Sequence, residues 1–94
     1  MILSYRDKQT ARFASGGLVR EFSAFAGQAF KRLEILDAAT SLDDLRALRS
    51  NRLEALRGDR IGQFSIRINA QWRICFRWQR GERGPQDVEI VDYH

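Results

Sequence analysis

The chain has 94 residues, which is enough for one domain and too few for two. An apolar fraction of 44% with 11% aromatic residues is typical of a globular protein and excludes a disordered chain. The net charge is +4, and fourteen of the sixteen basic residues are arginines. Ten of these arginines lie within residues 46–83, beside only three carboxylates. This local excess of arginine predicts a polyanionic partner such as nucleic acid.

Several classes of protein are disfavoured by what the chain contains. A single cysteine excludes an internal disulfide, which fits a reducing compartment. One histidine, one cysteine and scattered carboxylates supply no metal-ligand cluster, so we predict neither a metal ion nor another cofactor. Residues 1–8 contain no signal-peptide core, and no apolar run approaches membrane-spanning length. We therefore expect a cytoplasmic protein with no membrane partner.

The first half of the chain reads as mostly helical. Residues 1–5 form a short apolar run that predicts a strand, and residues 8–14 predict a short helix that ends at a Ser-Gly-Gly break. Apolar residues at spacings of three and four predict the main helix over residues 20–38, with its aromatic stripe in the core. Ser41 is placed to cap a further short helix over residues 42–48.

The second half reads as strands and turns. Residues 53–56 predict a short extended segment, and residues 58–60 predict a turn into the next element. Residues 62–78 alternate apolar and polar side chains, which indicates a β-hairpin with one buried face. A polar loop over residues 79–86 and a last strand over residues 87–93 complete the chain.

The register of this hairpin follows from the requirement that cross-strand partners point to the same face. A three-residue loop over residues 69–71 pairs Ile66 with Ile74 and Arg67 with Arg73, whereas a two-residue loop would pair apolar residues with charged ones. Like charges directly opposite each other destabilise a sheet. The predicted Arg67–Arg73 pair therefore favours an anion between the two side chains.

These elements predict one α+β domain over residues 1–94, with an N-terminal strand and helices packed on one face of an antiparallel sheet. The other face is expected to be open to solvent. Arg67, Arg73 and Arg77 lie on that open face.

Metal-free RNA cleavage needs a base for the 2′-hydroxyl, an acid for the 5′-oxygen and cations on the phosphorane. Arg67 and Arg73 are candidates to hold the phosphate. His94 is a candidate acid or base because it titrates near neutrality, and Tyr93 is placed to stack a base or relay a proton. A frayed His94 and a solvated arginine face remain the alternative. The arginines expected to contact RNA around the pair are Arg57, Arg60 and Arg77.

Two segments, NRLEALRGDRIGQFSIRINAQWRICFRW from residue 51 and DVEIVDYH from residue 87, resemble the HigB-type toxins of the RelE superfamily, also described as plasmid-maintenance killer proteins. The resemblance implies a RelE-like fold and a ribosome-dependent endoribonuclease that cuts mRNA without a metal ion. It also implies a HigA-type helix-turn-helix antitoxin, with which the toxin represses its own operon at operator DNA.

The resemblance also implies which residues act. The positions that match the family's phosphate-holding and catalytic residues are Arg67, Arg73, Asp92, Tyr93 and His94. The chain departs from the family at two positions, with Arg57 where some members have lysine and Glu54 where some have histidine. A histidine-based role therefore does not carry over to position 54.

A second hypothesis comes from a different class of protein. The chain would then be a catalytically weak RelE-like binding module that acts through its antitoxin and operator DNA. The two hypotheses differ in whether ribosome-bound mRNA is cut.

Overall fold

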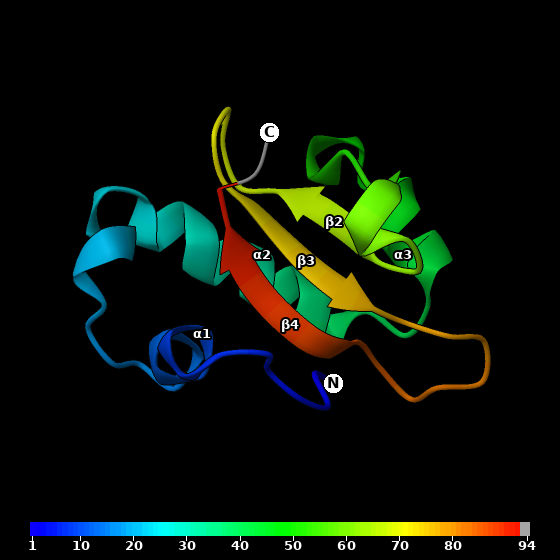
Figure 1. Ribbon diagram of the computed structural model, residues 1–94, viewed down its shortest axis with the longest axis horizontal. Helices are drawn as coiled ribbons and strands as arrows, with labels where there is room; N and C mark the ends of the chain where they lie inside the picture. Colours follow the sequence, from blue (N-terminus) through cyan, green and yellow to red (C-terminus); the bar gives the residue numbers. More distant parts are fainter. Residues whose placement is uncertain (93–94) are drawn as a thin grey trace.

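The computed structural model describes residues 1–92 and confirms the α+β class (Figure 1). The helical elements are α1 (Lys8–Ala14), the 3-10 helix η1 (Arg20–Phe25), α2 (Ala26–Ala38), α3 (Leu42–Ala47) and the 3-10 turns η2 (Arg49–Asn51) and η3 (Gly58–Arg60). The strands are β1 (Glu54–Ala55), β2 (Phe64–Arg67), β3 (Arg73–Arg77) and β4 (Gln86–Val91). They form an antiparallel sheet in the order β1-β2-β3-β4, and α2 crosses one face of it (Figure 1).

The hydrophobic core lies between this face of the sheet and the helices. Alternate residues of each strand enter it, because side chains of a strand point to opposite faces in turn. The core residues of the sheet that have no exposed surface are Ile66, Ile74, Phe76 and Val88. Trp72 covers one end of the core, with its ring centroid 5.8 Å from that of Phe22 and 4.9 Å from that of Phe25.

The predicted hairpin register is confirmed. Arg67 lies directly opposite Arg73 across the β2–β3 pair. The three-residue loop is closed by the side chain of Asn69, whose Oδ1 accepts hydrogen bonds of 2.8 Å from the backbone N–H groups of both Gln71 and Trp72. An asparagine that bonds the backbone ahead of it stabilises such a turn.

The N-terminal segment differs in detail from the predicted strand. Residues 1–5 form a single parallel bridge, between Tyr5 and Val88, rather than a continuous strand. The chain leaves the sheet edge at once because Asp7 begins α1, where its side chain accepts a hydrogen bond of 3.2 Å from the Thr10 N–H. The helix over residues 8–14 has the predicted bounds.

The predicted helix over residues 20–38 is divided in two. Residues 20–25 form η1, and the α-helix α2 begins only at Ala26. The 3-10 geometry repeats every three residues, so it aligns Phe22 and Phe25, which both pack against Trp72. Phe30 was expected in the core, but 40% of its surface is exposed.

The second face of the sheet is covered at its centre, which corrects the expectation of an open face. Ser65 and Cys75 have no exposed surface there. Glu89 lies on this face and forms ion pairs with Arg60 at 3.3 Å and with Arg6 at 3.8 Å. A layer of paired charges therefore lies over the middle of the sheet.

The outer edge of β4 is joined to α1 by a buried hydrogen bond, which gives a first prediction. The backbone N–H of Ile90 donates to Thr10 Oγ1 at 3.1 Å, and Thr10 is fully buried. In Thr10→Val the shape is kept but this N–H has no acceptor, so unfolding should become easier by about 1–3 kcal/mol. Urea denaturation followed by tryptophan fluorescence measures this change. Thr10→Ser keeps the acceptor and should lose less, so equal losses in both variants would contradict the role of the hydroxyl.

A second prediction concerns the thiol beneath the charged layer. Burial raises the pKa of Cys75 from 9.0 to about 11, against the opposing effect of Arg60. A raised pKa in the folded state stabilises the protein below pH 9, and this contribution is lost as the pH rises towards 11. The free energy of unfolding, measured relative to Cys75→Ala, should therefore fall over this interval.

The same burial predicts that iodoacetamide at neutral pH labels Cys75 much more slowly in the folded protein than in urea. Equal labelling rates in the two states would show that the thiol is accessible.

Candidate nucleic-acid interface

The cross-strand pair of Arg67 and Arg73 is held in place by neutral oxygen atoms. The Nε group of Arg73 donates to Ser65 Oγ at 2.7 Å, and its Nη2 group donates to the Arg52 carbonyl at 2.6 Å. The Nε group of Arg67 donates to the Asn69 carbonyl at 3.1 Å. Within residues 1–92, neither guanidinium forms an ion pair. Hydrogen bonds to neutral oxygens therefore position both groups, and no carboxylate of residues 1–92 neutralises their charges.

Two adjoining cavities surround this pair. One, of about 460 Å³, is lined by Arg52, Leu53, Glu54, Arg67, Ala70 and Arg73. The other, of about 530 Å³, is lined by Arg32, Arg49, Ser50, Arg52, Arg67 and Ile68. They share Arg52 and Arg67, so they adjoin at these two side chains, and we call the two cavities together the arginine groove. Within residues 1–92, its lining contains five arginines and a single carboxylate.

The backbone of Arg52 is strained where it meets Arg73. Its φ of 47° and ψ of 53° lie in the left-handed region, which costs a non-glycine residue roughly 1–2 kcal/mol. This conformation accompanies the hydrogen bond that the Arg52 carbonyl accepts from Arg73. Strain of this kind clusters at functional sites, where the surrounding structure maintains it.

Three arginines that we expected to contact RNA lie elsewhere. Arg77 is at the far end of β3, a span of roughly 13 Å, and pairs with Asp87 at 3.7 Å. Arg60 is half-buried in its ion pair with Glu89. Arg57 is exposed just before η3. The structure does not bring these three side chains into the arginine groove.

The C-terminal stretch approaches the pair from β4. Val91 lies opposite Arg73 in the β3–β4 register, which places Asp92 beside the same end of the sheet (Figure 1). Asp92 Oδ2 accepts a hydrogen bond of 2.8 Å from the Gln71 side chain in the hairpin loop. Tyr93 and His94 lie outside the described residues, so their expected roles stay predictions.

Arg32, Arg49 and Arg52 were not among the residues predicted to form the site. Arg49 begins the turn η2, and Arg52 follows that turn with a left-handed backbone. The only signal for these two in the sequence was their place within the arginine-rich residues 46–83. Arg32 belongs to α2 and meets the groove only through tertiary packing, since its Nη1 donates to Ser50 Oγ at 3.2 Å and to Asn51 Oδ1 at 2.8 Å.

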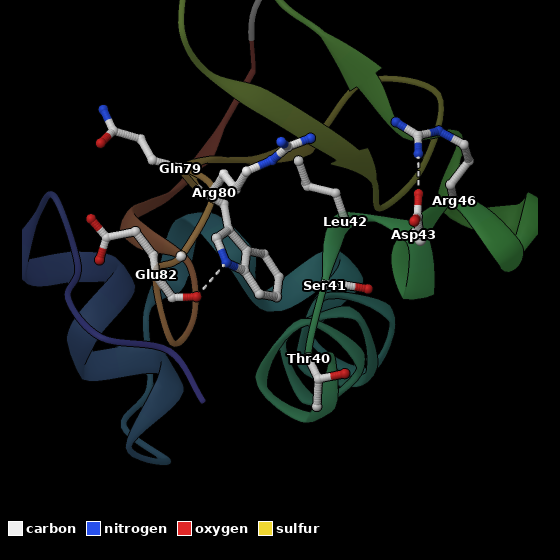
Figure 2. A pocket seen from close by; sticks show the side chains of 10 residues that line it. Thr40, Ser41, Leu42, Asp43, Arg46, Gln79, Arg80 and Glu82 are labelled. Atoms are coloured by element: carbon white, nitrogen blue, oxygen red, sulfur yellow. Dashed lines mark hydrogen bonds and ion pairs between the residues drawn. The ribbon is translucent and has the colours of Figure 1, made fainter.

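Another cavity, of about 350 Å³, lies between the start of α3 and the β3–β4 loop (Figure 2). Its charges are matched: Arg46 pairs with Asp43 at 2.6 Å, and Arg80 is accompanied by Glu82. Trp78 forms part of its wall and donates its indole N–H to the Glu82 carbonyl at 3.1 Å. Because its charges balance, this cavity is less suited to a polyanion than the arginine groove is.

Residues 1–92 contain no group of three or more metal-ligating side chains placed to hold a metal ion. In the same part of the chain, none of the helices has the length and apolarity that crossing a membrane requires.

Comparison with known proteins identifies a matching family and similar sequences. A family model described as "RelE-like toxin of type II toxin-antitoxin system HigB" matches residues 3–94. The chain is 39% identical over 83 residues to Toxin HigB-1 of Vibrio cholerae, across 86% of this chain and 87% of that protein. It is 38% identical over 63 residues to Endoribonuclease HigB of Proteus vulgaris, across 67% of this chain and 65% of that protein.

Among solved structures, the YoeB/ParE toxin from Agrobacterium tumefaciens is 14% identical and aligns with a TM-score of 0.48, across 99% of this chain and 97% of that one. The family model and the two sequence relatives cover most of the chain described above. The chain belongs to the HigB family of RelE-like toxins of type II toxin–antitoxin systems.

Proposed function

We propose that this toxin is an endoribonuclease that cuts mRNA during translation on the ribosome, without a catalytic metal ion. The observation that carries the proposal is the Arg67–Arg73 pair, in which two arginines lie directly opposite each other across β2 and β3 and line one cavity, with no ion pair within residues 1–92. A like-charged cross-strand pair costs stability unless an anion lies between its members. The name of the Proteus vulgaris relative supports RNA as that anion.

Arginine suits this chemistry because its planar fork binds two phosphate oxygens at once. In the proposed reaction the 2′-oxygen forms a bond to phosphorus and the bond to the 5′-oxygen breaks. The 2′-hydroxyl proton goes to a base, and an acid returns a proton to the 5′-oxygen. Arg67 and Arg73 stabilise the negative charge that grows on the phosphorane. The products are a 2′,3′-cyclic phosphate and a 5′-hydroxyl end.

The acid and base are expected within the stretch Asp92, Tyr93 and His94. The position of Asp92 supports this expectation, because the end of β4 lies beside Arg73 and the hairpin loop. The hydrogen bond from Gln71 fixes the Asp92 carboxylate at that end of the sheet. Arg57, Arg60 and Arg77 lie away from the groove and are proposed only as outer RNA contacts.

Membership in a type II family implies an antitoxin as partner. We propose a HigA-type helix-turn-helix protein, with which the toxin binds operator DNA. The ribosome, its mRNA and the antitoxin are all cytoplasmic, so the toxin is proposed to act there.

The direct test is induced expression followed by mapping of mRNA 5′ ends for wild type, Arg73→Ala and Arg83→Ala. Cuts within translated codons should appear with wild type and fall by about 10²-fold or more in Arg73→Ala, as expected when one donor to a developing anion is removed. Arg83→Ala removes the same charge from an exposed position in the β3–β4 loop and should cut normally.

Arg73→Lys distinguishes geometry from charge, because lysine is a point charge without the two-pronged fork. Circular dichroism and urea denaturation of each variant check that it is folded. The cut ends should carry a 5′-hydroxyl, and a 2′-deoxy nucleotide at the cleaved position should block the reaction. Ends with a 5′-phosphate would contradict attack by the 2′-oxygen. Growth arrest or antitoxin binding without any cuts would favour the binding-module hypothesis instead.

A further inference from the structure

The arginine groove continues beyond the Arg67–Arg73 pair in one direction. The geometry points to a second phosphate-binding subsite at Arg49 and Arg52, which holds a phosphodiester of the nucleotides that flank the cleaved bond on the same RNA strand. The inference rests on the proposed function for the location of the cleaved bond. It adds a minimum length of substrate and a path for the strand along the arginine groove.

Continuity is the first argument for a shared strand. The cavity around Arg49 and the cavity around Arg73 have Arg52 and Arg67 in common, so the two cavities adjoin at these side chains. Their combined lining follows η2, the start of β1 and the β2–β3 hairpin. A single strand whose phosphate lies at the Arg67–Arg73 pair therefore meets Arg52 and Arg49 next as it follows the groove.

Charge is the second argument. Arg49 and Arg52 are exposed, and neither forms an ion pair within residues 1–92. Arg32 lines the same cavity, donates to the neutral oxygens of Ser50 and Asn51, and forms no ion pair with any other residue of the described part of the chain. Three arginines gathered without an ion pair repel one another, and a phosphate placed among them relieves that repulsion.

Rigidity is the third argument. Asn51 is fully buried, accepts from Arg32 through Oδ1 and donates to the Leu45 carbonyl through Nδ2 at 3.0 Å. It thereby joins α2 to α3 through η2, the turn that carries Arg49. A fixed backbone on either side of a cation lowers the entropic cost of binding an anion there.

Arg52 connects the two subsites. Its side chain lines both cavities, while its carbonyl holds the Nη2 group of Arg73 from a left-handed backbone. A phosphate that binds the Arg52 side chain therefore sits on the residue that positions Arg73. Occupation of the second subsite should hold the pair in the geometry needed at the cleaved bond.

The test measures binding of purified toxin to 2′-O-methyl RNA, which cannot be cleaved, by fluorescence anisotropy over a series of KCl concentrations. A hexanucleotide reaches both subsites, whereas a dinucleotide has a single phosphodiester for the Arg67–Arg73 pair. The variants are Arg49→Ala and Arg52→Asn, since asparagine tolerates the left-handed backbone. Arg83→Ala is the control, because it removes one positive charge outside the groove. Arg73→Ala removes one arginine of the first subsite, the Arg67–Arg73 pair.

For single-stranded RNA, each lost phosphate contact should reduce the slope of log K against log[KCl] by roughly 0.7. We expect this reduction for the hexanucleotide in Arg49→Ala and in Arg52→Asn, and no change for the dinucleotide in Arg49→Ala, because Arg49 lines only the second cavity. Arg83→Ala should match wild type with both ligands, and Arg73→Ala should weaken both. Wild-type slopes in the Arg49 and Arg52 variants, or no measurable wild-type binding at low salt, would overturn the inference.

Two further measurements distinguish this inference from binding of ribosomal RNA at the same subsite and from failure of the proposed function. If the two variants bind free RNA normally but bind ribosomes without mRNA more weakly, the subsite holds ribosomal RNA, and its assignment to the message strand is overturned. If wild type cuts no mRNA although the slopes fall as expected, the proposed function fails and the subsite stands as an RNA-binding site. If mRNA cutting depends on Arg73 but the salt slopes of the Arg49 and Arg52 variants are unchanged, the proposed function holds and the second subsite is contradicted.

Discussion

The site depends on the register of the β2–β3 hairpin, in which burial of apolar side chains opposes the repulsion between two arginines. A shift of β2 by one residue would separate Arg67 from Arg73 but would turn Ile66 away from the core, while Ile74 stays in it. Burial of each isoleucine stabilises the fold by roughly 1.5–3 kcal/mol, whereas a like-charged pair on a sheet surface costs about 1 kcal/mol or less. Packing therefore decides the register, and the Asn69 turn fixes it. The core thus holds two cations together at the surface.

The remaining charges of this face explain where the site lies. At the middle of the sheet Glu89 pairs with Arg60 and Arg6, and at the far end of β3 Arg77 pairs with Asp87. These pairs cover Ser65 and Cys75 and occupy the cations that lie over them. Only towards the hairpin loop do arginines gather without ion pairs within residues 1–92. Carboxylates neutralise the arginines over the rest of this face, so the candidate interface is the part of the face where arginines gather and carboxylates are few.

Features set by local chemistry could be predicted from the sequence. The period-2 pattern and the loop length were enough for the hairpin register, and the Ser41 cap marked the start of α3. Features set by tertiary contacts could not. Nothing local shows that Arg52 adopts a left-handed backbone to bind Arg73, or that Arg32 of α2 reaches η2. The covered second face was missed because nothing local shows that Arg6 and Arg60, which lie outside the sheet strands, pair with Glu89 of β4.

The central claim is that a phosphate of the cleaved RNA lies between Arg67 and Arg73. The most direct measurement is a cryo-electron microscopy structure of the toxin on a ribosome that carries 2′-O-methyl mRNA. The account predicts that the phosphate at the blocked bond lies within hydrogen-bonding distance of both guanidiniums, with the strand continuing along the arginine groove. A message strand that crosses another face of the sheet, or a phosphate that contacts neither arginine, would contradict it.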